Sequence, residues 1–343
     1  MIFASDNWTG ASDAVMAALT RHNSGMAPAY GGDPLTESVT KRFSEVFERE
    51  VAVFFVTTGT AANSLALSAY AKPGGAIFCH DEAHVLVDEC NAPEFFTSGM
   101  KLVALKGPEG KFTPASLRTA LAALPEGVVH HGRPAAVTIT QATEAGTVYG
   151  LDEIRAISDV ATKRGIALHM DGARFANALV HLDVSPADMT WRAGVDVLSF
   201  GATKNGCWCA EAVVFFNKDD AEGFGYLRKR GGQLLSKSRF AAAQFEGYFE
   251  NGNWLELARH ANAMAARLAD GIHASESGRL AWVPQANEVF PVFKREKFAE
   301  LNAAGAIMHE WPAKNLGADE TLARMVTSFR TTRDEVEAFL SLL

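Results

Sequence analysis

Apolar runs of strand length recur along the first two thirds of the chain and alternate with segments of helical spacing. Each run is rich in β-branched and aromatic residues and ends in a polar or glycine-containing break, which is typical of buried strands. Helical spacing predicts helices at 60–71, 114–123 and 151–164, the last closed by Gly165. The alternation predicts an α/β fold with a mostly parallel sheet and helices on both faces. The predicted strands are 51–56, 74–80, 101–105, 135–140, 165–171, 196–200 and 211–216.

The pattern changes after about residue 235. Long stretches of helical spacing are followed by short strand-like pieces at 280–284 and 289–293, a helix near 294–304, and a last strand and helix. We therefore predict a smaller α+β domain, with its boundary in or beside the long helix around 245–272. The predicted division is an amino-terminal arm at 1–25, a large domain at 26–245 and a small carboxyl-terminal domain at 246–343.

Composition narrows the class of protein. The 343 residues are 48% hydrophobic and 21% charged, an ordinary globular balance. The formal net charge of −8 comes from side chains scattered without long blocks of one sign, which disfavours nucleic acid and membrane surfaces as partners. The sequence starts without the pattern of a secretory signal, and no apolar stretch approaches the roughly 18 residues of a membrane span. We expect a cytoplasmic protein.

The four cysteines are too few and too irregularly spaced for a disulfide framework, so we expect free thiols. Cys207 and Cys209 resemble half of a metal site, but no second close pair of Cys or His residues has the usual ligand spacing. We therefore expect no metal.

Thr58, Gly59 and Thr60 lie between a predicted strand and a predicted helix. Unpaired backbone N–H groups and the positive end of the helix dipole attract a phosphate at such a position. A Thr-Gly turn also caps helices that bind nothing, so the motif alone leaves both interpretations open.

One predicted strand ends on Asp171 and another ends shortly before Lys204, at the place where α/β proteins hold their ligands. Asp171 alone fits a helix cap equally well. In combination, a phosphate turn, an acid and a lysine favour pyridoxal phosphate, because the acid keeps the pyridine nitrogen protonated and the lysine binds the cofactor covalently. Burial and the cationic ring would lower the pKa of that lysine and favour its reactive, neutral form.

The chain resembles the threonine aldolase family of the fold type I pyridoxal phosphate enzymes. The resemblance covers most of the sequence and is carried by SDNWTGASDAVMAAL, YGGDPLTESVTKRFSEVF, TTGTAANSLAL, HDEAHVLVDE, GTVYGLDEIRAISDVATKRGIALHMDGARFANAL, the Lys204 segment and LARMVTSF. It implies an aspartate aminotransferase-like large domain followed by a small α+β domain. The implied assembly is a homotetramer whose sites are completed between subunits.

The resemblance also implies roles for individual residues. Lys204 resembles the cofactor-binding lysine and Asp171 the partner of the pyridine nitrogen, with Gly59, Thr60 and the neighbouring Thr58 at the phosphate. His84 resembles the family's histidine over the cofactor ring, where it can also handle the proton of the substrate β-hydroxyl. The residues that resemble the clamp on the substrate carboxylate are Ser5, Arg174, which also lies at the cofactor, and Arg324, a task that suits the arginine fork. Tyr30, Lys229 and Arg230 fall in segments that similar enzymes use near the cofactor.

Two segments depart from the family pattern. QATEAG at 141–146 replaces a Thr-His-Asn-Gly stretch, with Glu144 in the place of the histidine, and KNGCWCAEA replaces a glycine-rich segment after the lysine. The role of the missing histidine passes to Glu144, to water or to His84.

The implied activity is cleavage of a β-hydroxy-α-amino acid, of the threonine, allo-threonine or phenylserine type, to glycine and an aldehyde. A β-eliminating lyase or an aminotransferase on the same fold is the alternative. Two other classes stay open: a metalloprotein in which His80 and His84 bind a metal, and a noncatalytic binding protein on the same scaffold.

Overall fold

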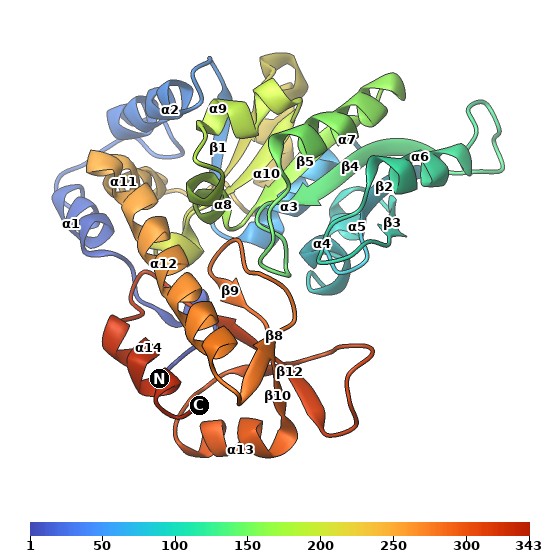
Figure 1. The fold of residues 1–343 in the computed structure, drawn as a ribbon. Helices are drawn as coiled ribbons and strands as arrows, with labels where there is room; N and C mark the ends of the chain where they lie inside the picture. The colour runs from blue at the N-terminus through green and yellow to red at the C-terminus, as the bar shows by residue number, and fades with distance from the viewer.

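A seven-stranded sheet forms the centre of the computed structural model, which describes residues 1–343 (Figure 1). The strand order is β1-β7-β6-β5-β4-β2-β3. β7 is antiparallel to both of its neighbours, and every other neighbouring pair is parallel. Six strands therefore run in one direction and end at the same edge. The strands are β1 (Ala52–Val56), β2 (Gly75–His80), β3 (Lys101–Leu105), β4 (Arg133–Thr140), β5 (Ala167–Gly172), β6 (Val197–Gly201) and β7 (Glu211–Phe215).

Helices connect these strands, and local sequence explains where several of them begin. Thr58 caps the first helix after β1, and Thr113 and Ser116 form a capping box at the start of the helix that begins at Pro114. The α/β class and the three helices predicted from spacing, now α3, α6 and α7, are confirmed. The helices up to residue 249 are α1 (Asp13–Arg21), α2 (Pro34–Val46), α3 (Gly59–Ser68), α4 (His84–Val87), α5 (Ala92–Phe96), α6 (Pro114–Ala122), α7 (Leu151–Lys163), α8 (Phe175–Leu182), α9 (Pro186–Met189), α10 (Phe224–Arg230) and α11 (Arg239–Phe249).

The long helix α12 (Asn253–Ala274) leads into a second, five-stranded sheet at the lower end of the view in Figure 1. Its strands pair in the order β11-β12-β10-β8, and β9 also pairs with β12. The predicted change to short strands and helices is confirmed, whereas the predicted domain bounds stay a prediction. The elements are β8 (Gly278–Leu280), β9 (Glu288–Val289), β10 (Pro291–Lys294), α13 (Arg295–Ala303), β11 (His309–Trp311), β12 (Glu320–Val326) and α14 (Arg333–Leu340).

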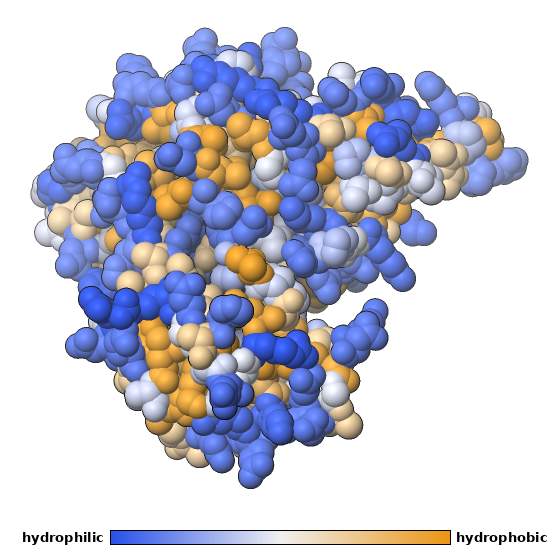
Figure 2. Space-filling model, in the orientation of Figure 1, coloured by the Kyte–Doolittle hydropathy of each residue, from blue (hydrophilic) through white to orange (hydrophobic).

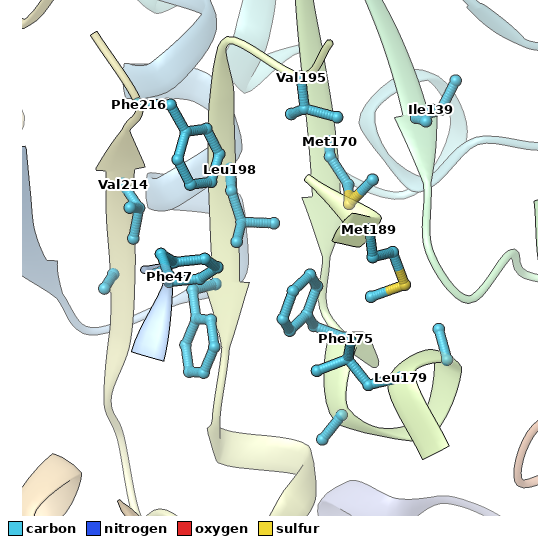
Figure 3. Close-up of a cluster of buried hydrophobic side chains, with 14 of the residues drawn as sticks. Phe47, Ile139, Met170, Phe175, Leu179, Met189, Val195, Leu198, Val214 and Phe216 are labelled. Carbon is cyan, nitrogen blue, oxygen red and sulfur yellow. The ribbon is translucent and has the colours of Figure 1, made fainter. Parts of the chain in front are cut away.

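Two main clusters of buried apolar side chains hold the fold together. The larger one lies against the central sheet, and Figure 3 shows Phe47, Phe175, Leu198 and Phe216 side by side within it. The rings of Phe47 and Phe216 meet edge to face with centroids 5.2 Å apart, a favoured aromatic geometry. The second cluster joins α12 and α14 to the smaller sheet and includes Phe3 from the amino-terminal segment.

The surface of the molecule is largely hydrophilic on the face drawn in Figure 2, with small hydrophobic patches between the polar side chains. None of the helices combines the length and the apolar character required to span a bilayer.

Candidate functional site

Five of the predicted site residues lie where parallel strands end. Thr58 follows β1, His84 follows β2, Glu144 follows β4, Asp171 is the second-last residue of β5, and Lys204 follows β6. Because these five strands share one direction, their carboxyl ends lie at a single edge of the sheet, the usual ligand-binding edge of α/β folds. The predicted positions of Asp171 and Lys204 at strand ends are confirmed, whereas the roles of the five residues stay a prediction.

Asp171 and Lys204 lie at the ends of adjacent parallel strands. Asp171 of β5 pairs with Ser199 of β6, and Lys204 lies five residues after Ser199 in the chain. Lys204 lies in a short 3-10 turn, Thr203–Asn205, and its side chain is half-buried. A Cβ at Gly201 would lie 2.6 Å from Cα of Ala173, so only glycine allows the ends of β5 and β6 to approach this closely.

Asp171 is buried and held by two donors. Its Oδ1 accepts a hydrogen bond from the backbone N–H of Ala173 at 3.0 Å, and its Oδ2 accepts one from Nδ2 of Asn63 at 2.8 Å. The same Nδ2 of Asn63 also donates to Oε1 of buried Glu89 at 2.8 Å, and Nδ1 of His84 lies 2.8 Å from that Oε1. A chain of hydrogen bonds thus connects the acid at the end of β5 with the histidine of α4.

This chain of bonds sets the protonation of His84. The hydrogen bond with Glu89 raises the pKa of His84 above its usual value; burial opposes the rise, and the charges of Asp171 and Glu144 add to it. Burial raises the pKa of Glu89, an effect that the bonds from His84 and Asn63 reduce. Because Glu89 engages Nδ1, the other ring nitrogen of His84 is the one free to exchange a proton.

The amino terminus of α3 presents free donors at the same edge. The side chain of Thr58 caps the helix by accepting from the N–H of Ala61 at 3.1 Å. The N–H groups of Gly59 and Thr60 make no hydrogen bond within the chain, and the space where a Cβ of Gly59 would point is open for 4 Å. A phosphate fits this arrangement, since it needs unpaired N–H groups and close access to the backbone.

The two arginines predicted to bind a carboxylate are both engaged by carboxylates of the chain. Asp6 accepts from Nε and Nη2 of Arg174 at 2.8 and 3.1 Å. Oε1 of Glu288 accepts from Nε and Nη2 of Arg324 at 3.1 and 2.6 Å, and Oε2 of Glu288 lies 3.2 Å from Nη1 of Arg174. The structure therefore brings the two arginines together through Glu288.

Burial and neighbouring charges act against each other in this cluster. Burial opposes the charged form of Arg174, but Asp6, Glu288 and Glu144 raise its pKa above the usual value. Burial alone would raise the pKa of Asp6, yet Arg174 and Lys204 hold it below the usual value. For Glu288 burial prevails and raises the pKa, although Arg174 and Arg324 act to lower it. The short turn Asp6–Trp8 lies against the turn Thr203–Asn205, so the cluster adjoins the lysine.

Glu144 is half-buried and makes no hydrogen bond or ion pair in the chain, and its charge acts on His84, Arg174 and Glu288. Ser5 is half-buried beside Asp6 and accepts from the N–H of Asn7 at 3.1 Å. Both residues therefore belong to the neighbourhood of the two arginines.

Tyr30, Lys229 and Arg230 are exposed and make no contact with this neighbourhood within the chain. The ammonium of Lys229 lies 5.5 Å from the centre of the Tyr30 ring, so these two form a separate surface pair. Their part in the site stays a prediction that requires a neighbouring subunit.

Asp6, Asn63, Glu89 and Glu288 were not predicted as site residues, although each contacts one that was. Two of them left a signal in the sequence. Glu288 directly precedes the apolar stretch VFPVF, and Asn63 occupies an otherwise small and mostly apolar helix segment. A polar side chain at a position that the sequence pattern places in the core needs a hydrogen-bond partner. Its presence there could have marked both residues as members of a buried polar cluster.

His80 and His84 make separate contacts. Nε2 of His80 lies 3.0 Å from the carbonyl oxygen of Gly107, and its Nδ1 accepts from the N–H of Glu82 at 3.1 Å. No three His, Cys, Asp or Glu side chains are arranged to hold a metal ion. All four cysteines are free, as predicted.

Comparisons with known proteins agree with this geometry. The model of the β-eliminating lyase family matches residues 3–294, and the chain therefore belongs to that family. The sequence is 46% identical over 303 residues to a low specificity L-threonine aldolase of Pseudomonas aeruginosa, covering 88% of this chain and 87% of that protein. The structure matches a Leishmania major threonine aldolase with a TM-score of 0.93 and 30% identity, covering 99% of this chain and 98% of that one.

Within the family, the chain thus groups with the threonine aldolases, as the sequence motifs predicted. The fold alone is shared more widely. A Sphingomonas wittichii serine palmitoyltransferase matches with a TM-score of 0.72 at 15% identity, covering 100% of this chain and 86% of that one. The fold type I architecture predicted from the sequence is confirmed.

Proposed function

We propose that this protein cleaves a β-hydroxy-α-amino acid, of the threonine, allo-threonine or phenylserine type, to glycine and an aldehyde with pyridoxal phosphate as cofactor. One observation carries the proposal: Asp171, Lys204 and the free N–H groups of α3 lie at the carboxyl edge of the same sheet. These are the acid, the amine and the phosphate donors that this cofactor requires. The similarity to threonine aldolases supports the reaction class.

The residues fit the cofactor at three points. Lys204 would bind its aldehyde carbon, the carboxylate of Asp171 would hold the proton on its pyridine nitrogen, and the N–H groups of Gly59 and Thr60 would bind its phosphate. Asn63 and Ala173 fix the orientation of the Asp171 carboxylate through their hydrogen bonds. When bound, pyridoxal phosphate acts as an electron sink for the bond that breaks at the α-carbon.

The remaining residues orient the substrate and move its proton. Ser5, Arg174 and Arg324 would bind the α-carboxylate and so fix which bond of the α-carbon faces the electron sink. His84 would accept the proton of the β-hydroxyl, since the bond between its Nδ1 and Glu89 leaves its other ring nitrogen free. The charge of Glu144 raises the pKa of His84 and would help it to hold that proton. Removal of that proton lets the Cα–Cβ bond break with release of the aldehyde.

The proposal includes a homotetramer in the cytoplasm, as the resemblance implies, with Tyr30 contributed across an interface. Analytical ultracentrifugation of the purified protein tests the assembly. A dimer or tetramer would support a shared site, and a strict monomer would contradict it.

The test of function is an absorbance spectrum of the purified protein with pyridoxal phosphate, followed by product analysis with threonine, allo-threonine and phenylserine. We expect visible absorbance that borohydride reduction fixes to the chain, and release of glycine and aldehyde. Ammonia and a keto acid would instead identify a β-eliminating lyase, and transfer of the amino group an aminotransferase. Lys204→Ala should lose both absorbance and turnover. The matched control is Lys218→Ala, which removes an exposed lysine paired with Glu50 and should change neither.

A further inference from the structure

Glu288 occupies the groups that would otherwise bind a substrate carboxylate. Its Oε1 accepts hydrogen bonds from both Nε and Nη2 of Arg324. This edge of the guanidinium is one with which an arginine can bind a carboxylate through two parallel hydrogen bonds. Its Oε2 faces Nη1 of Arg174 at 3.2 Å, and the remaining edge of Arg174 is taken by Asp6. A carboxylate of the chain thus lies between the two arginines in the manner expected of a bound ligand.

The charges of this cluster balance. Arg174 and Arg324 contribute two positive charges, and Asp6 and Glu288 contribute two negative ones. Glu288 and Asp6 are buried, at 0% and 2% exposure, so little solvent screens them. Glu144 adds a further negative charge within range of Arg174. An arriving carboxylate therefore meets arginines without net positive charge, although the resemblance assigns them to bind it.

The two carboxylates of the cluster differ in how they are held. Asp6 also accepts from Nδ2 of Asn287 at 3.1 Å, so both of its oxygens are engaged by donors. Oε2 of Glu288 is buried and accepts no hydrogen bond. Glu288 alone touches both arginines, and one of its oxygens lacks a hydrogen-bond donor. It is therefore the carboxylate that an incoming anion competes with.

We propose that Glu288 is an affinity-determining residue, which competes with the substrate's carboxylate for Arg324 and Arg174 and so keeps the binding of amino acids weak. This inference rests on the proposed function, in which those arginines bind the substrate. The competition by Glu288 weakens the binding of substrate and product equally, because both carry the α-carboxylate. Interactions made equally in the ground state and the transition state change KM and leave the chemical step unaltered. Weaker binding of the product carboxylate also speeds release of glycine.

The test is the affinity of the cofactor-loaded protein for glycine and for glycinamide, measured by isothermal titration for wild type and for Glu288→Gln. Gln keeps the size of the side chain and removes its charge. Removing a buried like charge beside the ligand should lower the Kd for glycine on the order of tenfold or more. Glycinamide carries no carboxylate, so its Kd should stay within about twofold. KM for the amino-acid substrate should fall with the Kd for glycine.

Glu310→Gln is the matched control, because Glu310 is a half-exposed acid of the neighbouring strand β11 that pairs with Arg295 at 2.9 Å. Glu288→Met, an uncharged side chain of similar length, serves if the Gln variant does not fold, which thermal unfolding establishes. Unchanged or weaker glycine binding in the variant overturns the inference, and so does equal tightening of glycinamide, since that indicates a general structural change. Wild-type protein that binds neither pyridoxal phosphate nor glycine would overturn the proposed function as well.

Discussion

The buried pair of Asp6 and Arg174 should contribute strongly to stability, and Asp6→Asn tests this. Asp6 accepts three hydrogen bonds, two from Arg174 at 2.8 and 3.1 Å and one from Asn287 at 3.1 Å. Asn offers one acceptor oxygen, so its NH2 group must face a donor of Arg174 or Asn287. Breaking a buried ion pair by removing one charge costs about 3–5 kcal/mol. Arg174 would keep only its contact with Glu288, at 3.2 Å between Nη1 and Oε2.

The assay is urea-induced unfolding at one protein concentration, which yields the free energy of unfolding. The control is Asp13→Asn, whose side chain is 93% exposed and pairs with Arg330 at 2.8 Å; such a surface pair contributes at most about 1 kcal/mol. An Asp6→Asn variant within about 1 kcal/mol of wild type, or no less stable than the control, would refute the reasoning.

The same carboxylate gives a pH dependence with a defined sign. The pKa of Asp6 is lowered in the folded protein, because Arg174 and Lys204 outweigh the effect of burial. Its contribution to stability is therefore present above the unfolded pKa of about 4 and is lost as pH falls through the lower folded value. Acid unfolding of Asp6→Asn should lack this loss, and an identical acid transition in both proteins would contradict it.

Three further predictions concern other parts of the structure. Glu89→Gln removes the anionic acceptor that raises the pKa of His84. Because a base must be neutral to accept a proton, the acidic limb of the pH profile of kcat/KM should move to lower pH. An unmoved limb argues against His84 as the base. His169 is buried between Thr138 and Ser199, and burial lowers its pKa to about 3, so its NMR signals should show a neutral ring at pH 5, whereas a titration near 6.5 would contradict the burial argument. Gly146→Ala places a Cβ 2.7 Å from the carbonyl oxygen of Glu288 at a φ of +68°, whereas Gly127→Ala has a φ of +78° but open space around its Cβ. Gly146→Ala should therefore lower the free energy of unfolding by about 1–3 kcal/mol more than Gly127→Ala does. Equal free energies of unfolding for the two variants would exclude the clash.

Much of the central sheet could be predicted because its strands are buried on both faces. Such strands read as continuous apolar runs, as in VLSFG of β6, in which all five residues are buried. The short helices α4 and α9 could not be predicted, since four residues are too few to show a helical period. β11, with three residues at an edge of the smaller sheet, lacks such a signal for the same reason.

The site divides in a similar way. Asp171 and Lys204 could be found because they follow strands, a position that sequence alone indicates. The pairing of Asp6 with Arg174 and of Glu288 with Arg324 could not be found, because these contacts connect distant parts of the chain. Pairing of this kind depends on how the two sheets are placed relative to each other, which local patterns do not encode.

The segment around Phe3 has a consequence for synthesis on the ribosome. The N–H of Phe3 bonds to the carbonyl oxygen of Ile307, and its own carbonyl oxygen accepts from the N–H of Val326, both at 2.8 Å. Phe3 is translated early, but its hydrogen-bond partners are translated near the end of the chain. The central sheet, in contrast, has all its strands once residue 215 has been translated. A nascent chain can thus fold its sheet early, but Asp6 cannot be anchored beside Arg174 by these contacts until translation is almost finished.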